Sequence, residues 1–558
     1  MASNQSDLYL GLDLSTQQLK YTVINNDHDI IAEAAVHFDK DLPEFKTTNG
    51  AIADGDIVTS PTLMWVKAID ILLQRLSKHS EIKVENIKGI SGAGQVQNLQ
   101  HGSVYWKKDG LKTLASLNPE SALENQLKDA FAITQSPIWQ DASTTKQCRS
   151  LEQLVGGAQS LAEKTGSKGY ERFTGNQIAK IYEQNRSAYD TTAAITLVSS
   201  FIATVLLGKL APVDAADGSG MNMMDIHSHK WITSILDHCG GNDLKDKLGP
   251  EPVEGGTALG NISSYFVTRY GFSPECVIAP FTGDNSATLV SMNLEPGDCV
   301  VSLGTSDTML MYLPIATPTT ESHIMSHPTN PDAYMGMLCY KNGSLTREKI
   351  RDMYASGDWT AFNCLLDESP PGLTNGCQRR GFYYYMQEII PFAKGFHRFE
   401  DNKEVEEFSG DKEQVARYNV RAIIESQFMS MKVRTSRMLD THGKSSDTSQ
   451  ATKLKRILAT GGAASNPHLL QVLSNVLNLP VYKKQGMNSA SLGGALLAKF
   501  AIRRQSGYTN SFEQMMDDEQ RDKVAHQLVA EPQTTHTQVY DNMVDDFVRL
   551  EQLVVQNT

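Results

Sequence analysis

A strand, a hydroxyl-rich turn and a returning strand occur twice in this chain, and this repeat constrains the fold more than any other feature. In the first copy, residues 8–14 form an apolar strand, residues 15–18 form the turn and residues 19–24 return. In the second copy, residues 299–303 lead into a Gly-Thr-Ser turn and residues 308–313 return. Apolar runs bounded by small and hydroxyl residues are typical of hairpin strands, and a recurring unit indicates internal duplication. We therefore expect two β-meanders with helices, each presenting a hairpin to a shared cleft.

The length of 558 residues predicts more than one domain, because single hydrophobic cores stop growing well below this size. A glycine-rich segment at residues 254–262 precedes the second copy of the repeat. A boundary just after it gives an N-terminal domain of residues 1–275 and a C-terminal domain of residues 276–558, with the last helices free to pack back on the first domain. Strands and helices interleave in both parts, so the expected fold class is α/β.

The charge balance excludes several classes of partner. With 51 basic and 64 acidic residues the formal net charge is −13, and no basic patch stands out. This argues against nucleic acid or an anionic membrane as the main partner and favours a small molecule. An anionic substrate would then need a local positive site or a metal ion to offset the overall field.

Cysteine usage and apolar segments indicate a soluble, cytoplasmic protein. The seven cysteines are scattered without a C-x-x-C motif, which is typical of free thiols in a reducing compartment. The amino terminus lacks the layout of a signal peptide. The most apolar stretch, residues 193–207, is shorter than a bilayer span and carries several hydroxyls, so we expect a buried core helix there.

Two turns about twenty residues apart carry the most chemically informative side chains. Asp284 lies in a glycine turn after the apolar run 277–281, and Gly304, Thr305 and Ser306 follow the second strand-like segment. A carboxylate facing backbone N–H groups of a tight turn suits a base opposite a phosphate. Asp13, at the end of the first strand before the Thr16 turn, suits hydrated Mg²⁺ beside phosphates. Ordinary turns and a solvated aspartate are the alternative interpretation of each motif taken alone.

Further candidates lie in loops. His101 lies in a polar loop between two strands and suits hydroxyl binding, although most loop histidines are simply solvated. Arg172 stands beside an aromatic, a combination that suits either a sugar or a surface ion pair. Trp359 is a candidate aromatic wall. Gly461 and Gly462 join a strand to a helix, which suits close approach of a planar base or a phosphate, or serves structure alone.

Taken together, these motifs resemble those of a known family over nearly the whole chain and in the same order. The chain resembles the FGGY carbohydrate kinases, and within them most closely the eukaryotic D-xylulose kinases. The segments that carry the resemblance are residues 10–18 (LGLDLSTQQ), 100–106 (QHGSVYW), 172–175 (RFTG), 283–285 (GDN), 303–306 (LGTS) and 460–462 (TGG).

The resemblance implies two actin/ribonuclease-H-like domains that flank an active-site cleft, with the sugar held largely by the first and ATP by the second. The implied activity is ATP- and Mg²⁺-dependent phosphorylation of D-xylulose to D-xylulose 5-phosphate. The alternatives are an FGGY kinase for another sugar or polyol, such as ribulose, glycerol or gluconate, and a non-catalytic nucleotide-binding scaffold with the actin fold.

The resemblance also implies a role for each matching residue. Asp284 would be the catalytic base. The sugar would be held by His101, Arg172, Asp284 and Asn285. The nucleotide would be held by Thr16, Gly304, Thr305, Ser306, Trp359, Gly461, Gly462, Ala463 and Asn466, and Asp13 would hold Mg²⁺ through water. Residues 96–99 are inserted relative to the usual family pattern before His101, which bears on the position of that histidine.

Overall fold

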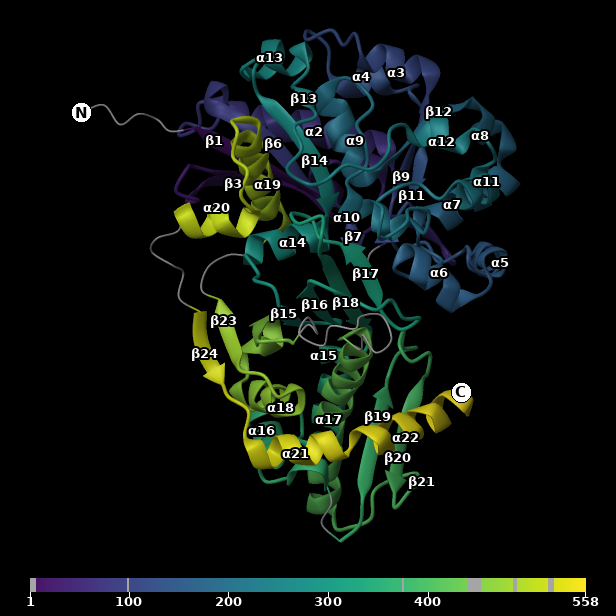
Figure 1. The fold of residues 1–558 in the computed structure, drawn as a ribbon, viewed down its shortest axis with the longest axis vertical. Helices are drawn as coiled ribbons and strands as arrows, with labels where there is room; N and C mark the ends of the chain where they lie inside the picture. Colours follow the sequence, from purple (N-terminus) through teal and green to yellow (C-terminus); the bar gives the residue numbers. More distant parts are fainter. Residues whose placement is uncertain are drawn as a thin grey trace, which may run out of the picture.

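Two mixed β-sheets organise the molecule, one in the upper and one in the lower half of Figure 1. The computed structural model describes residues 7–97, 100–373, 376–439, 453–484, 489–519 and 526–557. Helices cover both sheets, which confirms the α/β class. The part of the chain built on the upper sheet is called the first half below, and the part built on the lower sheet the second half.

The first sheet has six strands in the order β13-β14-β6-β1-β2-β3. Strands β1, β2 and β3 form an antiparallel meander, while β6 and β14 run parallel to β1. Asp13 of β1 pairs with Ala93 of β6, which in turn pairs with Thr282 of β14. The strands are β1 (Leu8–Leu14), β2 (Gln18–Ile24), β3 (Ile30–His37), β6 (Ile87–Gly94), β13 (Gly260–Asn261) and β14 (Val277–Gly283).

The second sheet repeats this plan in the order β17-β18-β16-β15-β22-β23-β24. Strands β15, β16 and β18 form an antiparallel meander, and β22 and β23 run parallel to β15. The internal duplication expected from the sequence is therefore confirmed. The strands are β15 (Asp298–Leu303), β16 (Asp307–Leu313), β17 (His323–Ser326), β18 (Tyr334–Tyr340), β22 (Arg456–Thr460), β23 (Val481–Lys484) and β24 (His526–Ala530).

Four small sheets and further helices complete the two halves. The strands are β4 (Ile52–Asp54), β5 (Ile57–Pro61), β7 (Val96–Gln97), β8 (Gln100–His101), β9 (Ser103–Lys107), β10 (Phe131–Ile133), β11 (Gln135–Pro137), β12 (Thr192–Leu197), β19 (Arg379–Tyr384), β20 (Gly395–Glu400) and β21 (Lys403–Val405). The longer helices are α2 (Thr62–Ser77), α5 (Thr145–Val155), α7 (Thr174–Gln184), α9 (Val198–Leu207), α11 (Thr233–Gly240), α14 (Asp284–Met292), α15 (Ser344–Tyr354), α16 (Trp359–Asp367), α17 (Lys412–Leu439), α18 (Pro467–Leu477), α19 (Ala490–Gln505), α20 (Phe512–Glu519), α21 (Thr534–Asn542) and α22 (Val544–Gln556).

The single helix expected over residues 193–207 is wrong, because the structure divides this segment into strand β12 and helix α9. Three of the six residues of β12, Thr192, Ile195 and Thr196, have branched side chains that favour a strand. There β12 pairs with β9, so tertiary pairing decides the state of a run whose periodicity alone fits either element. All ten residues of α9 are buried, as expected for so apolar a helix.

Helix α19 follows the second sheet in sequence but packs on the first. It contacts β1, β6 and α14, and Figure 1 shows it beside the upper sheet with α20. Glycines allow this close approach, because a Cβ at Gly493 would overlap the carbonyl oxygen of Ala287 in α14. A Cβ at Gly11 of β1 would likewise overlap the carbonyl oxygen of Ser491. Helices α21 and α22 instead pack in the lower half.

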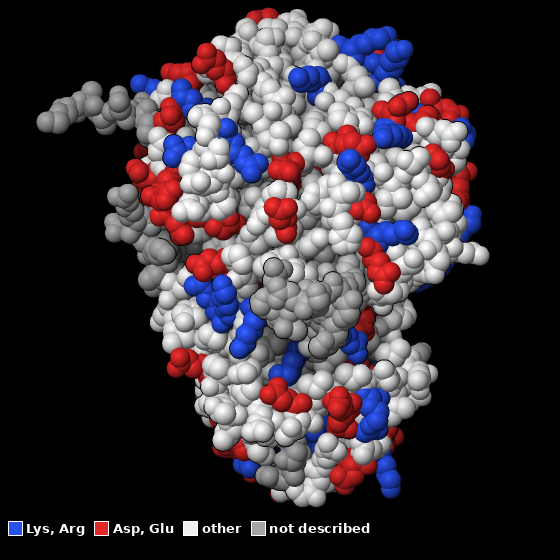
Figure 2. Space-filling view, viewed as in Figure 1, with Lys and Arg blue, Asp and Glu red and all other residues white. Residues whose placement is uncertain are grey.

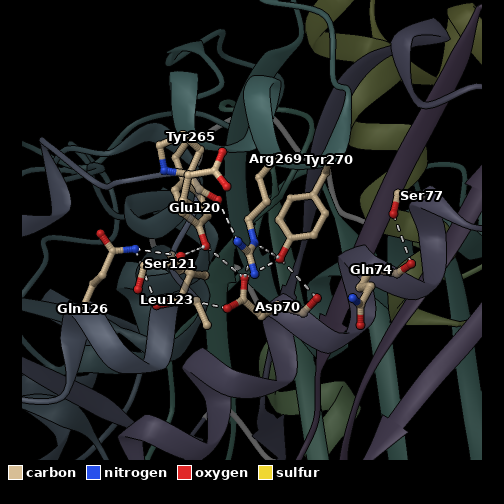
Figure 3. Close-up of polar contacts among 12 residues, drawn as sticks. Asp70, Gln74, Ser77, Glu120, Ser121, Leu123, Gln126, Tyr265, Arg269 and Tyr270 are labelled. Atoms are coloured by element: carbon tan, nitrogen blue, oxygen red, sulfur yellow. Dashed lines mark hydrogen bonds and ion pairs between the residues drawn. The ribbon is translucent and has the colours of Figure 1, made fainter.

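A buried carboxylate ties the outer helices of the first half together (Figure 3). Asp70 of α2 accepts hydrogen bonds from the backbone N–H of Leu123 at 2.6 Å and from the hydroxyl of Tyr265 at 3.3 Å. The hydroxyl of Tyr270 also donates to it, and the guanidinium of Arg269 lies 3.8 Å away. A buried charge supplied with several donors stabilises the packing of these elements. None of these residues is a candidate site residue, and we interpret the cluster as structural.

Charges of both signs are interspersed over the face drawn in Figure 2. Within the described part of the chain, no helix combines the length and apolar character needed to cross a membrane. The seven cysteines, all within the described residues, form no disulfide bond with one another, as expected from their spacing.

Candidate active site

Three parallel strands of the first sheet end side by side, and candidate residues lie at or just after these ends. Asp13 lies near the end of β1, Gly94 ends β6, and Gly283 ends β14 directly before Asp284. Gly94 pairs with Gly283, so the segments that follow β6 and β14 start as neighbours. Ligands of open α/β sheets bind at the carboxyl ends of parallel strands. This edge is therefore where a small substrate can meet side chains from several strands.

The glycine neighbour of Asp284 predicted a turn at this position. That prediction is wrong, because Asp284 is the first residue of helix α14. Strand β14 is buried along its whole length and passes into the helix through Gly283 without a loop. The side chains of Asp284 and Asn285 are half-buried at this helix start. An aspartate in a first helical turn is favoured by the helix dipole, which stabilises its anionic form. Figure 1 shows α14 on the side of the upper half that faces β15 and β16.

The described part of the insertion before His101 forms strand β7, which pairs with strand β8. Val96 pairs with His101 and Gln97 with Gln100. Strand β7 contacts α14, and β8 contacts the 3-10 turn of residues 219–221, so the backbone of His101 lies at the same sheet edge as Asp284. Residues 98 and 99 and the side chain of His101 lie outside the described part of the structure.

Arg172 lies at the junction of the two halves, just before helix α7. It is half-buried, and burial lowers its pKa while the acidic groups of Glu171, Cys339 and Asp141 raise it. Cys339 belongs to β18 of the second sheet. The guanidinium therefore lies near residues of both halves, a position suited to an anionic or hydroxyl-bearing ligand between them.

The second sheet presents the corresponding edge and a cavity of about 660 Å³. Ser302 of β15 pairs with Thr460 of β22, so the turns that follow these strands are neighbours. Six of the predicted nucleotide residues line the cavity: Gly304, Thr305, Trp359, Gly462, Ala463 and Asn466. Gly461 has φ 85° and lies against the backbone of Leu303, a close approach that needs glycine. A volume of this size is in the range of sites for small organic ligands.

Trp359 forms one wall of the cavity at the start of α16. The guanidinium of Arg351 lies 4.8 Å from the centre of its indole ring, and the ring of Phe362 meets it edge-on at 5.2 Å. Also lining the cavity, the amide Nδ2 of Asn466 donates to Oδ1 of Asn363 at 2.8 Å. Asn466 also caps helix α18 by accepting the N–H of His468 at 3.0 Å, which fixes its amide orientation. An aromatic face and fixed amides in one cavity suit a planar heterocycle.

The turn of Gly304, Thr305 and Ser306 is held from behind by helix α15. The N–H of Ser344 donates to the carbonyl of Gly304 at 2.8 Å, and the N–H of Gly343 donates to that of Thr305 at 3.2 Å. Thr305 and Ser306 are exposed, and their N–H groups donate to no acceptor within the described residues. With its carbonyls turned toward α15, the turn offers these two donors to an anion.

Thr16 and Asp13 lie together at the first hairpin. Trp139 donates from Nε1 to the hydroxyl of Thr16 at 2.8 Å. Burial raises the pKa of Asp13 to about 6 although Lys20 lowers it, so the carboxylate is anionic at neutral pH. Its Oδ1 is buried without a hydrogen-bond partner among the described residues, which suits a cation or its water. The described residues contain no cluster of three acidic, histidine or cysteine ligands, so a dedicated protein cage for a metal is not seen there.

Models of one protein family match both halves of the chain. The N-terminal domain of the FGGY family of carbohydrate kinases matches residues 127–291, and its C-terminal domain matches residues 299–502. The chain belongs to the FGGY family of carbohydrate kinases. The xylulose kinase of Rattus norvegicus is 43% identical over 549 residues, which cover 98% of this chain and 97% of that protein.

Solved structures of sugar kinases share the fold. The ligand-bound xylulose kinase of Lactobacillus acidophilus aligns with a TM-score of 0.75 at 16% identity and covers 98% of both chains. The gluconate kinase of the same organism aligns with a TM-score of 0.76 at 16% identity, again over 98% of both chains. These similarities bear out two actin/ribonuclease-H-like domains, and the equal fit of two kinases with different sugars shows that the fold does not select the substrate.

Two acidic residues of the kinase were not anticipated from the sequence. Asp214 accepts the hydroxyl of Thr282 at 2.6 Å and the N–H of Asp217 at 3.1 Å, and the hydroxyl of Ser199 donates to Asp217. Burial raises the pKa of Asp217 well above its usual value, and the nearby charges of Asp214 and Asp284 raise it further. The only available signal was two aspartates three residues apart in a glycine-containing segment, which does not reveal that they approach Asp284.

We expect Asp214→Asn to make the protein more stable at pH 8 than the wild type. Burial raises the pKa of Asp214 to about 7, although hydrogen bonds from Thr282 and the backbone lower it. Because the folded pKa is raised, folding favours the protonated acid, and stability falls as the pH rises from about 4 to about 7. At about 1.4 kcal/mol per pKa unit, the change is on the order of 4 kcal/mol. Asparagine stays neutral and caps a helix as well as aspartate does.

Urea unfolding at pH 5, 6, 7 and 8 measures this difference. The gap between variant and wild type should widen as the pH rises, while the exposed control Asp27→Asn should show no such trend. A gap that is constant or that narrows toward alkaline pH would contradict the assignment.

Proposed function

We propose that this chain is a D-xylulose kinase, which transfers the γ-phosphoryl group of ATP to the terminal hydroxyl, O5, of D-xylulose. The observation that carries the proposed chemistry is that each of the two main sheets presents candidate residues at the carboxyl ends of its parallel strands. Asp13 and Asp284 lie at the carboxyl ends of strands in the first sheet. The turn with two exposed N–H donors and the 660 Å³ cavity lie at the carboxyl ends of strands in the second sheet. The choice of sugar is supported by relatives named xylulose kinase that match almost the whole chain.

The two halves of the molecule then have different roles in the reaction. His101, Arg172, Asp284 and Asn285 hold the sugar, and Asp284 accepts the proton of O5 as that oxygen attacks phosphorus. An ordinary aspartate suffices as base, because phosphoryl transfer has a loose transition state in which proton transfer comes late. In-line positioning and neutralisation of charge on the phosphate oxygens supply most of the acceleration. The N–H groups of Thr305 and Ser306 face those oxygens.

Mg²⁺ is the metal that the site fits. It takes oxygen ligands, keeps several waters and is commonly held by one or two carboxylates plus substrate phosphates. Asp13, with a buried oxygen that has no partner among the described residues, suits contact through water, and Thr16 lies beside it. When bound, the ion neutralises negative charge on the phosphates. We further propose a cytoplasmic location, which is supported by seven cysteines that form no disulfide bond among the described residues.

A coupled assay of ADP release with D-xylulose, ribulose, glycerol and gluconate tests the function. We expect D-xylulose to give the highest kcat/KM. Turnover of another of these sugars in preference would leave the kinase chemistry but replace the substrate. Nucleotide binding by calorimetry without binding of any sugar would instead favour the non-catalytic scaffold.

Trp359→Ala tests the position of the nucleobase. The indole face stacks on the base, and stacking on an aromatic side chain contributes about 1–3 kcal/mol, so we expect KM for ATP to rise by about 5- to 150-fold. KM for the sugar should change little. The control is Phe392→Ala, which removes an aromatic ring that is 71% exposed and lies outside the cavity. Unchanged KM for ATP in Trp359→Ala would contradict the assignment.

A further inference from the structure

We propose that the ion pair between Arg347 and Asp307 is a positioning device that holds the turn of residues 304–306 ready for the phosphates of ATP. Asp307 starts β16 directly after the turn, and Arg347 lies one turn into α15, where it borders the nucleotide cavity. The proposal rests on the proposed function and adds to it two residues that act through the turn and not by contact with the reacting atoms.

The pair is bidentate and fully enclosed. Nη1 of Arg347 donates to Oδ2 of Asp307 at 2.6 Å, and Nη2 donates to Oδ1 at 3.0 Å. Each side chain is 1% exposed. Burial raises the pKa of the Asp307 carboxyl, while Arg347 and the nearby backbone N–H of Gly304, the first residue of the turn, lower it. Asp307 therefore links a rigid guanidinium to the peptide plane where the turn begins, and the planar guanidinium fixes the orientation of the carboxylate.

A second set of contacts connects Arg347, through Gln427, to the carbonyl of Thr305 in the turn. Nη1 of Arg347 also donates to Oε1 of Gln427 on α17 at 2.9 Å, and Nε2 of Gln427 donates to the carbonyl of Asn342 at 2.8 Å. The next residue, Gly343, donates its N–H to the carbonyl of Thr305. The carbonyls of the turn are thus held by a network that connects to Arg347 and Asp307, which leaves the N–H groups after Gly304 for a ligand.

Gly343 shows how tightly this network encloses the turn. A Cβ there would lie 2.6 Å from the carbonyl oxygen of Thr305, 2.7 Å from that of Gly304 and 2.9 Å from Oδ1 of Asp307. The carboxylate, the turn and the start of α15 therefore meet at a single point with no room for adjustment. Loss of either charged partner leaves the other buried and uncompensated, so the local structure must move to resolve it. Because the carbonyl of Gly304 meets this point, we expect its peptide to shift.

The test compares Arg347→Lys and Asp307→Asn with the wild type, using calorimetry with ATP, ADP and adenosine and steady-state kinetics with the proposed sugar. Lysine keeps the charge but cannot make the bidentate contact, so we expect the affinity for ATP and ADP to fall by about tenfold or more. Because a misplacement of about 1 Å can cost about 10²-fold in rate, kcat should also fall. Affinity for adenosine, which lacks phosphates, and KM for the sugar should stay near wild type.

Arg434→Lys is the matched control. Arg434 of α17 forms a second buried pair, with Glu551, in which the side chains are 1% and 7% exposed. Its replacement should lower the melting temperature as Arg347→Lys does, but leave the ATP-to-adenosine affinity ratio unchanged. If the charged-pair variants fold too poorly to assay, Gln427→Met removes the hydrogen bonds that link Arg347 to the carbonyl of Asn342 while leaving the ion pair in place. It should weaken ATP binding by about threefold or more, as expected for the loss of hydrogen bonds of this kind.

Three outcomes would overturn the inference. One is wild-type ATP affinity in Arg347→Lys and Asp307→Asn, or in Gln427→Met where those two do not fold. Another is an equal loss of adenosine and ATP affinity, since this would mean that the whole cavity has collapsed. A wild-type protein that binds neither ATP nor ADP would overturn the proposed function and the inference together, whereas the first two outcomes leave the function intact.

Discussion

Asp284→Asn is expected to lower kcat by about 10²- to 10⁴-fold, the usual contribution of general acid–base catalysis by one side chain. Asparagine has nearly the same shape and remains compatible with the start of α14, but it cannot accept the proton of the sugar hydroxyl. The loss should appear in kcat with D-xylulose and ATP, while the dissociation constant of ATP stays near wild type. A coupled assay together with calorimetry separates these quantities.

The matched control is Asp70→Asn, which alters a buried carboxylate in the same half that contacts none of the described candidate site residues named above. We expect it to cost stability, because Leu123, Tyr265 and Tyr270 lose a charged acceptor, and to leave kcat per folded molecule unchanged. If Asp284→Asn retains more than about a tenth of the wild-type kcat, Asp284 is not the base. A loss of less than about tenfold falls below the range for general-base catalysis.

Gly493→Ala is expected to destabilise the protein by about 3 kcal/mol or more, the upper part of the range for overpacking. In an isolated helix this change would stabilise by about 1 kcal/mol, because alanine is the better helix former. Here the new methyl group would overlap the carbonyl of Ala287 on α14, and backbone cannot move aside as a side chain can. Either α19 leaves the first sheet or α14 shifts with Asp284.

Urea unfolding and kcat measure the two consequences. Gly11→Ala should produce a similar loss, because it forces the same helix away from β1 at the carbonyl of Ser491. Gln505→Ala, at the exposed end of α19, should change stability by no more than about 0.5 kcal/mol, as surface substitutions usually do. A stabilising effect of Gly493→Ala would show that the close packing of α14 and α19 does not hold in solution.

Local patterns predicted much of this protein, since the chemistry of a turn or strand is written in adjacent residues. The repeated strand, hydroxyl turn and strand gave both meanders, and residues 457–466 gave the strand, glycine pair and helix that border the cavity. Where the local pattern fits either a strand or a helix, contacts with other parts of the chain decided the secondary structure. Residues 193–207 divide into β12 and α9 because β9 offers a pairing edge, and Asp284 starts a helix because β14 runs directly into it.

The sequence by itself determined the fold class, the duplication and the set of side chains able to handle a sugar and a nucleotide, because these depend on periodicity and on motifs of a few residues. Only the tertiary structure brought Asp214 and Asp217 toward Asp284, joined Arg347 to Asp307 and returned α19 to the first sheet. Such contacts join residues up to hundreds of positions apart, and their energy comes from burial and exact register. No local pattern in the chain encodes either of these before it folds.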